Sequence, residues 1–225
     1  MIVIIDNDRD ALFALRKRLY MHRTPSAILG TADIARIGHY PVHGILLHRP
    51  ENIENIEELC KEIRETYPSI PLLLTYRDTA PINYYVYRRM VDIMLEERTT
   101  TSTLLKRMYE CYEEKNGTIP CSFTVEGVRV IMNDPYVHIL MQAFPTRRVD
   151  YMILRYLSLT APRPVPAEEL LETAFPPSTR KRGPHTVAKV IAGFNNFVAR
   201  GFEGMRIIAL KRPHCYYIHR HHKDK

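Results

Sequence analysis

The sequence lacks the long apolar segments and the leader expected of a membrane or secreted protein. No apolar run approaches the roughly 18 uninterrupted residues that a membrane span requires. The first residues also lack the basic stretch followed by an apolar stretch that is typical of a signal peptide. We therefore expect a cytoplasmic protein with no membrane partner.

Cysteine is scarce, and its four residues do not form a metal-binding or disulfide pattern. Cys60, Cys111, Cys121 and Cys215 lie far apart, and none belongs to a CxxC motif. This spacing is typical of reduced thiols that pack as small apolar side chains. The histidine-rich end at 219–223 is more typical of an adventitious ligand cluster than of a metal site. We expect no metal and no cofactor.

The common signatures of catalysis are also missing. The sequence has no Walker loop, no GxSxG and no HExxH motif. We find no pair of carboxylates suited to acid–base chemistry outside the residues at the ends of the predicted strands in the first half. We therefore expect a protein that is not an enzyme.

Positive charge is concentrated in the second half of the chain. Residues 1–115 contain 16 Lys and Arg against 17 Asp and Glu, whereas residues 116–225 contain 16 against 8. Such an asymmetry is expected when one domain binds a polyanion. A basic surface that serves only solubility is the alternative, and charge alone does not decide between them.

The first half alternates apolar strands with amphipathic helices. The strands are wholly apolar, which favours a parallel sheet covered by helices on both faces. In such a sheet the functional site lies beyond the carboxyl ends of the strands. A cap at Thr101 or Ser102 is expected for the last helix. The predicted strands are 2–5, 26–29, 44–47, 70–75 and 91–95, and the predicted helices are 10–22, 32–37, 51–66, 82–90 and 103–114.

The second half follows a different pattern after a predicted linker at 115–121, which contains Asn116-Gly117 and Pro120. Short strand-like runs predict an antiparallel meander, and three helices followed by a basic hairpin predict a helix-turn-helix with a wing. The domains are therefore expected at 1–114 and 122–225. The predicted strands are 122–125, 128–132, 136–141, 206–210 and 216–219, and the helices are 147–159, 167–173 and 186–200.

Several short motifs occur in a characteristic order along the chain. In the first half they are residues 4–8 after the first strand, residues 46–48 after the third, residues 74–75 after the fourth and residues 91–97 at the fifth. In the second half they are residues 169–175 and residues 185–194. In this order the chain resembles an atypical response regulator of the OmpR/PhoB winged-helix family with a degenerate receiver. The resemblance implies an α/β, flavodoxin-like (βα)5 receiver domain followed by an α+β winged helix-turn-helix domain.

In that family, an aspartate at the end of the third strand accepts a phosphoryl group, with help from a bound Mg²⁺, a hydroxyl and a lysine. The matching positions here are His48 for the nucleophile, Asp6 and Asn7 for the acidic pair, Thr75 for the hydroxyl and Glu97 for the lysine. The resemblance therefore implies a phosphoacceptor pocket that has lost its chemistry.

An imidazole at position 48 cannot form an acyl phosphate, and we expect His48 to pair instead with Asp6 or Glu97. Three alternatives stay open. His48 can be a solvated residue at a strand end with no role, or a pH-sensing or phosphohistidine group. The receiver can also keep weak phosphorylation at Asp6 or Asp8.

Active receivers of the family pair through their fourth helix, fifth strand and fifth helix. We therefore expect a homodimer that needs no phosphorylation, with Asp92 facing arginines across a two-fold axis. Internal packing of some of the tyrosines on this face is the alternative. The expected dimer residues are Tyr84, Tyr85, Arg88, Asp92 and Arg107, with Tyr87 and Arg89 nearby.

The helix at 186–200 is the predicted DNA-reading element. Its apolar stripe is Val187, Val190, Ile191, Phe194, Phe197 and Val198. On the opposite face, Asn can pair with adenine and Lys with guanine, so we expect base contacts there. The candidates on that face and at the start of the helix are His185, Thr186, Lys189, Asn195 and Asn196, with Ala188 and Ala192 allowing close approach.

Phosphate contacts are expected from two basic segments. Arg180, Lys181 and Arg182 lie in the loop before the reading helix, and Lys211 and Arg212 lie at the wing. In the family the same loop can also contact RNA polymerase. The sequence thus predicts a sequence-specific, phosphorylation-independent transcription regulator that binds double-stranded DNA as a dimer. The alternative is a receiver-type interaction adaptor, regulated by a partner or small molecule, with secondary DNA binding.

Overall fold

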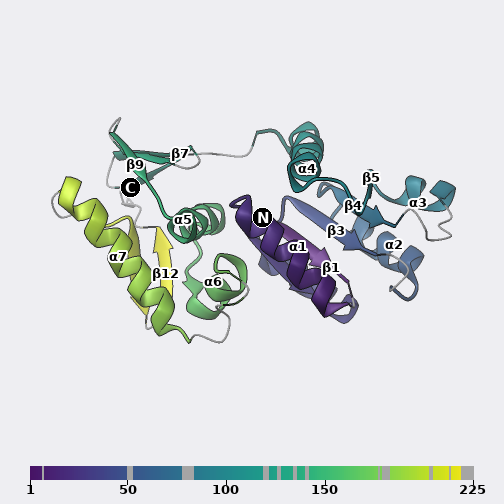
Figure 1. Cartoon of the computed structure of the whole chain (residues 1–225), viewed down its shortest axis with the longest axis horizontal. Coiled ribbons are helices and arrows are strands. Elements are labelled where there is room, and N and C mark those ends of the chain that lie inside the picture. The colour runs from purple at the N-terminus through teal and green to yellow at the C-terminus, as the bar shows by residue number, and fades with distance from the viewer. Residues whose placement is uncertain are drawn as a thin grey trace. The chain divides into compact units, whose positions relative to one another are not determined.

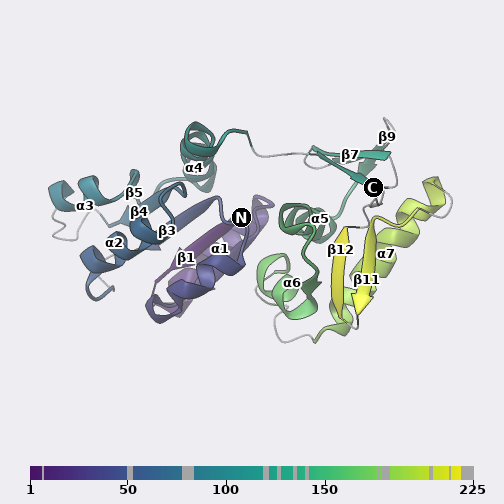
Figure 2. The same ribbon diagram turned by 180° about the vertical axis from the view of Figure 1, so that it is seen from behind.

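The computed structural model shows two compact units, Met1–Ile119 and Pro120–Lys225, each considered by itself. The boundary between them lies inside the predicted linker at 115–121. Figures 1 and 2 show the chain from opposite sides. The structure describes residues 1–6, 8–49, 53–77, 84–118, 122–125, 128–133, 136–139, 142–176, 178, 183–202, 205–212 and 214–218.

Unit 1 contains the predicted parallel sheet. Its strand order is β2-β1-β3-β4-β5, and every neighbouring pair is parallel. This is the flavodoxin-like order, so the predicted receiver fold is confirmed. The strands are β1 (Ile2–Ile5), β2 (Ser26–Leu29), β3 (Gly44–His48), β4 (Leu72–Tyr76) and β5 (Ile93–Glu96). The helical elements are α1 (Arg9–Met21), the 3₁₀ helix η1 (Thr31–His39), α2 (Ile56–Thr66), α3 (Tyr84–Met90) and α4 (Thr101–Asn116).

The sheet forms because the strands are apolar on both faces. All residues of β1 and β3 are buried. On one face, Ile4 and Leu46 pack in a cluster with Leu15 of α1 and Leu104 of α4. Gly44 permits the close approach of α4, because a Cβ at that position would lie 2.5 Å from the Sδ atom of Met108.

The start of α2 and the cap of α4 differ from the prediction. Helix α2 begins at Ile56, after Asn55 adopts a left-handed backbone conformation (φ 52°). Helix α4 is capped by Thr100, whose Oγ1 accepts a hydrogen bond of 3.2 Å from the Thr103 amide. The predicted cap at Thr101 or Ser102 is therefore wrong by one residue or two.

Unit 2 begins with a four-stranded antiparallel sheet in the order β6-β7-β8-β9. The strand predicted at 136–141 corresponds to β8, which ends at Ile139, and the strand β9, which begins at Gln142, was not predicted. The strands are β6 (Ser122–Val125), β7 (Val128–Asn133), β8 (Tyr136–Ile139) and β9 (Gln142–Pro145).

Three helices and a second sheet complete unit 2. The strand order of this sheet is β10-β12-β11, and β11 and β12 form the terminal hairpin with a bulge between Leu210 and Arg212. Three helices followed by a hairpin confirm the predicted winged helix-turn-helix architecture. The elements are α5 (Arg148–Thr160), β10 (Val165–Pro166), α6 (Ala167–Thr173), α7 (His185–Gly201), β11 (Ile208–Arg212) and β12 (Cys215–Ile218).

Helix α7 buries a narrower stripe than its apolar pattern predicts. Val187, Ile191, Phe194 and Val198 are buried. Phe197, which the pattern places in the core, is 41 % exposed. Its prediction as a core residue is wrong, and its ring lies instead at the surface of unit 2.

A membrane span would require a longer and more apolar helix than any found in the described ranges.

Candidate functional site

The carboxyl edge of the parallel sheet carries a cluster of buried polar side chains. Asp6 directly follows β1, His48 is the last residue of β3, and Thr75 is the second-last residue of β4. Each of these side chains is at most 4 % exposed. Parallel strands deliver these residues to one edge because their carboxyl ends point the same way. Of the predicted pocket, Asn7 lies outside the described residues.

His48 is bonded to Thr75 and is neutral at physiological pH. Its Nδ1 and the Thr75 Oγ1 share a hydrogen bond of 2.6 Å. Burial, aided by the positive charge of Arg49, lowers the pKa of His48 from 6.5 to about 4. The Nε2 atom lies 3.8 Å from Glu97 Oε1. Because the ring is neutral near pH 7, this contact is not the charged pair that would replace a lysine.

Arg49 carries the positive charge at this edge, and sequence reasoning missed it. Its Nη2 lies 2.6 Å from Glu97 Oε1 and its Nη1 lies 2.8 Å from Asp8 Oδ2. Arg77 contacts the other oxygen of Glu97, with Nε at 2.8 Å from Oε2. Although burial alone would raise it, these hydrogen bonds hold the pKa of Glu97 below its usual value. The available signal was the position of Arg49, directly after a buried strand.

The backbone of Arg49 has a φ of 54°. This value lies in the left-handed region, which few residues other than glycine adopt readily. The two ion pairs with Asp8 and Glu97 stabilise this conformation, because they hold the side chain between two carboxylates. Asp8 is further engaged through Oδ1, which accepts from the Ala11 amide at 3.2 Å.

These contacts do not fit the magnesium ion that the fold family implies. A divalent cation there would need free carboxylate oxygens. The guanidinium of Arg49 contacts Asp8 Oδ2, and its positive charge would repel a cation. Asp6 Oδ1 accepts from the Asp8 amide at 2.8 Å, so that among the described residues only Asp6 Oδ2 of these two carboxylates makes no hydrogen bond. The end of β3 supplies a neutral imidazole where a carboxylate would be needed. No step of a phosphoryl transfer follows from this geometry.

The predicted dimer face contains one residue that is already engaged within unit 1. The carboxylate of Asp92 accepts from the Leu72 amide at 2.8 Å and contacts Arg64 and Lys115 at 2.7 Å each. These internal contacts compete with the predicted pairing of Asp92 with arginines of a second copy, which stays a prediction. Arg88 and Arg107 are exposed, and the side chains of Tyr84 and Tyr85 lie outside the described residues.

The candidate nucleic-acid interface lies on α7 and the terminal hairpin. His185, Lys189 and Asn196 are exposed along one side of α7, while Thr186 is half-buried. The ring of His185 lies 5.7 Å from that of His214, centroid to centroid, so the start of α7 lies beside the hairpin turn.

Lys211 and Arg212 of the hairpin are also exposed. Arg212 Nε donates to Cys215 Sγ at 3.3 Å, which fixes the side chain at the turn. The predicted phosphate contacts Arg180, Lys181 and Arg182 lie outside the described residues.

Asn195 has a structural role that conflicts with base reading. Its Nδ2 donates to the Ile208 carbonyl at 2.8 Å, and its Oδ1 accepts from the Ile208 amide at 3.3 Å. Both ends of the amide are thus used to join α7 to β11. Figure 2 shows the ribbons of these two elements next to each other. We correct the prediction for Asn195, and Asn196 is the asparagine that faces solvent.

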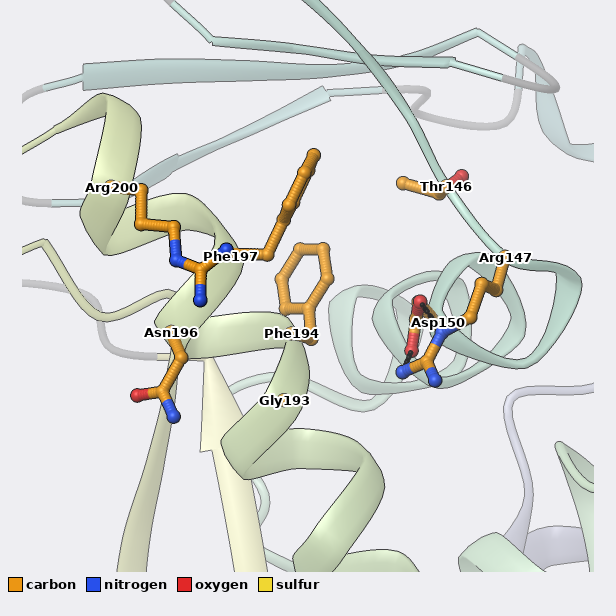
Figure 3. A pocket seen from close by; sticks show the side chains of 8 residues that line it. All are labelled: Thr146, Arg147, Asp150, Gly193, Phe194, Asn196, Phe197 and Arg200. Atoms are coloured by element: carbon orange, nitrogen blue, oxygen red, sulfur yellow. Dashed lines mark hydrogen bonds and ion pairs between the residues drawn. The ribbon is translucent and has the colours of Figure 1, made fainter.

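Unit 2 also contains a pocket that the sequence pattern did not indicate. Figure 3 shows the rings of Phe194 and Phe197 entering the space between α7 and the start of α5. The cavity has a volume of about 420 Å³. It is lined by Thr146, Arg147, Asp150, Gly193, Phe194, Asn196, Phe197 and Arg200.

No family model matches the sequence, and no curated protein matches it. Solved structures with a similar fold include response regulator DrrB of Thermotoga maritima, an OmpR/PhoB homologue with 17 % identity over 96 % of this chain and 97 % of that one, at a TM-score of 0.38. A streptococcal protein is described as one of a family of redox sensors evolved from two-component response regulators. It has 12 % identity over 97 % of this chain and 98 % of that one, at a TM-score of 0.41. A CheY-like receiver domain of Methanospirillum hungatei has 16 % identity over 51 % of this chain and 94 % of that one, at a TM-score of 0.43. By its own topology, unit 1 has a flavodoxin-like receiver fold and unit 2 has a winged helix-turn-helix fold.

Proposed function

We propose that this chain is a sequence-specific transcription regulator that binds duplex DNA through unit 2. The observation that carries the proposal is the exposed polar side of α7 next to an exposed basic hairpin. An α-helix of this kind fits the major groove, and a wing beside it reaches the backbone or the minor groove. The positive charge of residues 116–225 supports the same proposal.

Within this interface, Lys189, Asn196 and His185 are proposed to contact base edges, because their side chains are exposed on one side of α7. Lys211 and Arg212 are proposed to contact phosphates from the hairpin. The basic loop at 180–182 stays a proposed phosphate contact and a proposed surface for RNA polymerase.

The receiver-like unit is proposed to act without phosphorylation. The end of β3 offers His48 instead of an aspartate, and its ring is held by Thr75. The cation that phosphorylation chemistry would recruit is replaced by Arg49, which is bound by Asp8 and Glu97. The hydrogen bond to Thr75 and the two ion pairs of Arg49 hold these side chains in place without a phosphoryl group.

A homodimer through α3, β5 and α4 remains part of the proposal, with a changed residue set. Arg88 and Arg107 are exposed on this face, and arginine is enriched at protein interfaces. Since Asp92 is engaged internally, exposed Glu96 at the end of β5 is the better acidic partner.

The decisive experiment is selection of bound duplexes from a random DNA pool by protein never exposed to a phosphodonor. We expect enrichment of a repeated half-site with a spacing of about one helical turn. Recovery of no sequence above background would contradict DNA reading, and enrichment only after treatment with acetyl phosphate would contradict phosphorylation independence.

Substitutions then separate base reading from phosphate binding on the selected duplex. Lys189→Ala should reduce the discrimination between the preferred base and the other bases at one position by roughly 1–3 kcal/mol. Arg212→Ala should instead weaken binding to all sequences alike. Lys17→Ala, an exposed lysine of unit 1, is the matched control and should change neither. Anisotropy titrations on matched and mismatched duplexes measure both effects.

A further inference from the structure

The pocket between α5 and α7 has the size and lining of a small-molecule site. Its volume of about 420 Å³ lies within the range of about 300–1,000 Å³ that is usual for ligand pockets. Such sites combine apolar walls with a few polar groups that fix the orientation of the ligand. Here Phe194 and Phe197 supply apolar wall, and the remaining lining residues supply the polar groups (Figure 3).

Phe197 shows that the apolar wall is accessible. Its side chain is 41 % exposed although it lies on the helix that contributes most to the pocket, while neighbouring Phe194 is 3 % exposed. An exposed aromatic ring at the rim of a cavity offers contact area to a flat apolar ligand.

The charges of the pocket favour an anion. Arg147 is bonded to Asp150 through two hydrogen bonds of 2.8 and 2.9 Å, so these two residues neutralise each other. Arg200 lines the same pocket and makes no ion pair with any residue in the described ranges. Among the described residues, the lining therefore carries one positive charge that no acidic side chain pairs with, beside the exposed amide of Asn196.

Gly193 widens the pocket at its α7 wall. A glycine within a helix costs about 1 kcal/mol relative to alanine, so its place in the middle of α7 needs a reason. A Cβ at Gly193 would meet only Arg147 Nη2, at an ordinary 3.8 Å. Packing within the described residues therefore does not require glycine here, and the lack of a side chain leaves this part of the pocket wall uncovered.

We propose that this pocket binds a small organic monoanion with a flat aromatic ring, such as an aromatic carboxylate. The ring packs against Phe197, and the carboxylate pairs with Arg200 and accepts from Asn196. Since Asn196 also belongs to the proposed DNA-reading side of α7, an occupied pocket should weaken DNA binding; this consequence rests on the proposed function, whereas the pocket itself does not.

The test is calorimetric titration of the full chain, without DNA, with naphthalene-2-carboxylate. We expect saturation at one equivalent, and binding of the uncharged naphthalene-2-methanol at least about tenfold weaker, as loss of a charge-assisted hydrogen bond predicts. Acetate, which lacks the ring, should not saturate. Absence of saturation, or equal affinity for the acid and the alcohol, would overturn the proposal.

Variants locate the site. Arg200→Gln should weaken binding about tenfold, whereas Arg206→Gln, an exposed arginine outside the lining, should leave it unchanged. Gly193→Leu should block the pocket, and Phe197→Ala should reduce affinity if the leucine variant fails to fold. Equal losses for Arg200→Gln and Arg206→Gln would reduce the binding to non-specific charge attraction and overturn the assignment.

The consequence for DNA is measured separately by anisotropy on the selected duplex with and without naphthalene-2-carboxylate. Reduced DNA affinity for the wild type, but not for Gly193→Leu, is expected. If the chain binds no DNA, the calorimetry still decides the pocket, so the two failures are distinguishable. Unchanged DNA affinity at saturation would refute the coupling.

Discussion

At the scale of residues, Arg49 and His48 divide the work at the edge of the parallel sheet. Arg49 supplies a permanent charge that is bound by Asp8 and Glu97. His48 supplies an uncharged hydrogen-bonding group for Thr75. The two roles depend on each other, because the cation beside His48 helps to keep its ring neutral.

The neutral state of His48 predicts a dependence of stability on pH. Since the pKa of His48 is lowered from 6.5 to about 4 by folding, the unfolded chain binds more protons between these values. The free energy of unfolding should therefore fall as the pH is lowered from 6.5 to 4, by at most about 3 kcal/mol. Urea denaturation at a series of pH values measures this loss.

His48→Asn keeps a polar group near Thr75 and should flatten the dependence between pH 6.5 and 5, whereas His22→Gln at an exposed site should not. Glu97, with its lowered pKa, loses its contribution only at lower pH, as its carboxylate is protonated. An unchanged slope in His48→Asn would assign the acid sensitivity to other groups.

At the scale of elements, α7 is fixed to the hairpin by Asn195. Its paired hydrogen bonds to the backbone of Ile208 set the position of β11 relative to the helix. The neighbouring residue, Asn196, faces solvent. Two adjacent asparagines on one helix therefore serve different ends, one in the fold and one at the surface.

This difference predicts opposite outcomes for two similar substitutions. Asn195→Ala should lower the stability of unit 2 by about 1–3 kcal/mol, because it leaves partly buried backbone groups of Ile208 without partners. Asn196→Ala should leave stability unchanged and alter DNA affinity. Thermal unfolding and anisotropy on the same two proteins provide the comparison, and equal stabilities would contradict the structural role of Asn195.

The cap of α4 gives a second prediction for an element. Thr100→Ala should destabilise unit 1 by about 1 kcal/mol, because the Thr103 amide loses its acceptor. Ser102→Ala, one of the caps expected from sequence, is the matched control and should be nearly neutral, since Ser102 is exposed within the first turn. Urea denaturation midpoints test the pair; a larger effect at Ser102 would return the cap to the predicted position.

The elements show where sequence was sufficient. The strand β1 was predicted with its observed limits because its four residues are all apolar and all buried. The strand β9 was not predicted, because its four residues, Gln142–Pro145, form no apolar run and end in a proline. Phe197 was placed in the core because periodicity cannot show how wide the buried stripe of a helix is.

The site was less predictable than the fold. That Asp6, His48 and Thr75 come together follows from strand ends alone, and sequence reasoning placed them correctly at one edge. The pairing of Arg49 with Glu97 joins side chains 48 residues apart, and no local pattern encodes it. The ion pairs of Asp92 with Arg64 and Lys115 are equally non-local. The sequence therefore contains no sign that partners within unit 1 would compete with the predicted dimer contact of Asp92.

At the scale of the whole molecule, the two units differ in charge as well as in fold. Residues 1–115 are nearly neutral and residues 116–225 carry an excess of eight positive charges. A nearly neutral unit is suited to contact with a second copy of itself, because little repulsion opposes the approach. The basic unit is suited to a polyanion.

This division predicts a dimer formed by unit 1. Sedimentation of the full chain at micromolar concentration, without a phosphodonor, should show a dimer. Arg88→Glu should shift it to monomer, whereas Arg36→Glu, an exposed arginine on η1 away from the proposed face, should not. A wild-type monomer would remove the proposed dimer while leaving DNA binding by unit 2 to be tested alone.

Arg49 has a final consequence for how such a protein would be controlled. A charge that is covalently part of the chain cannot be removed by a chelator, hydrolysed with time or withdrawn by a phosphatase. Under the proposed function, a regulator built this way has no chemical timer in its receiver-like unit, and its occupancy of DNA would follow its own concentration and that of any ligand bound in unit 2.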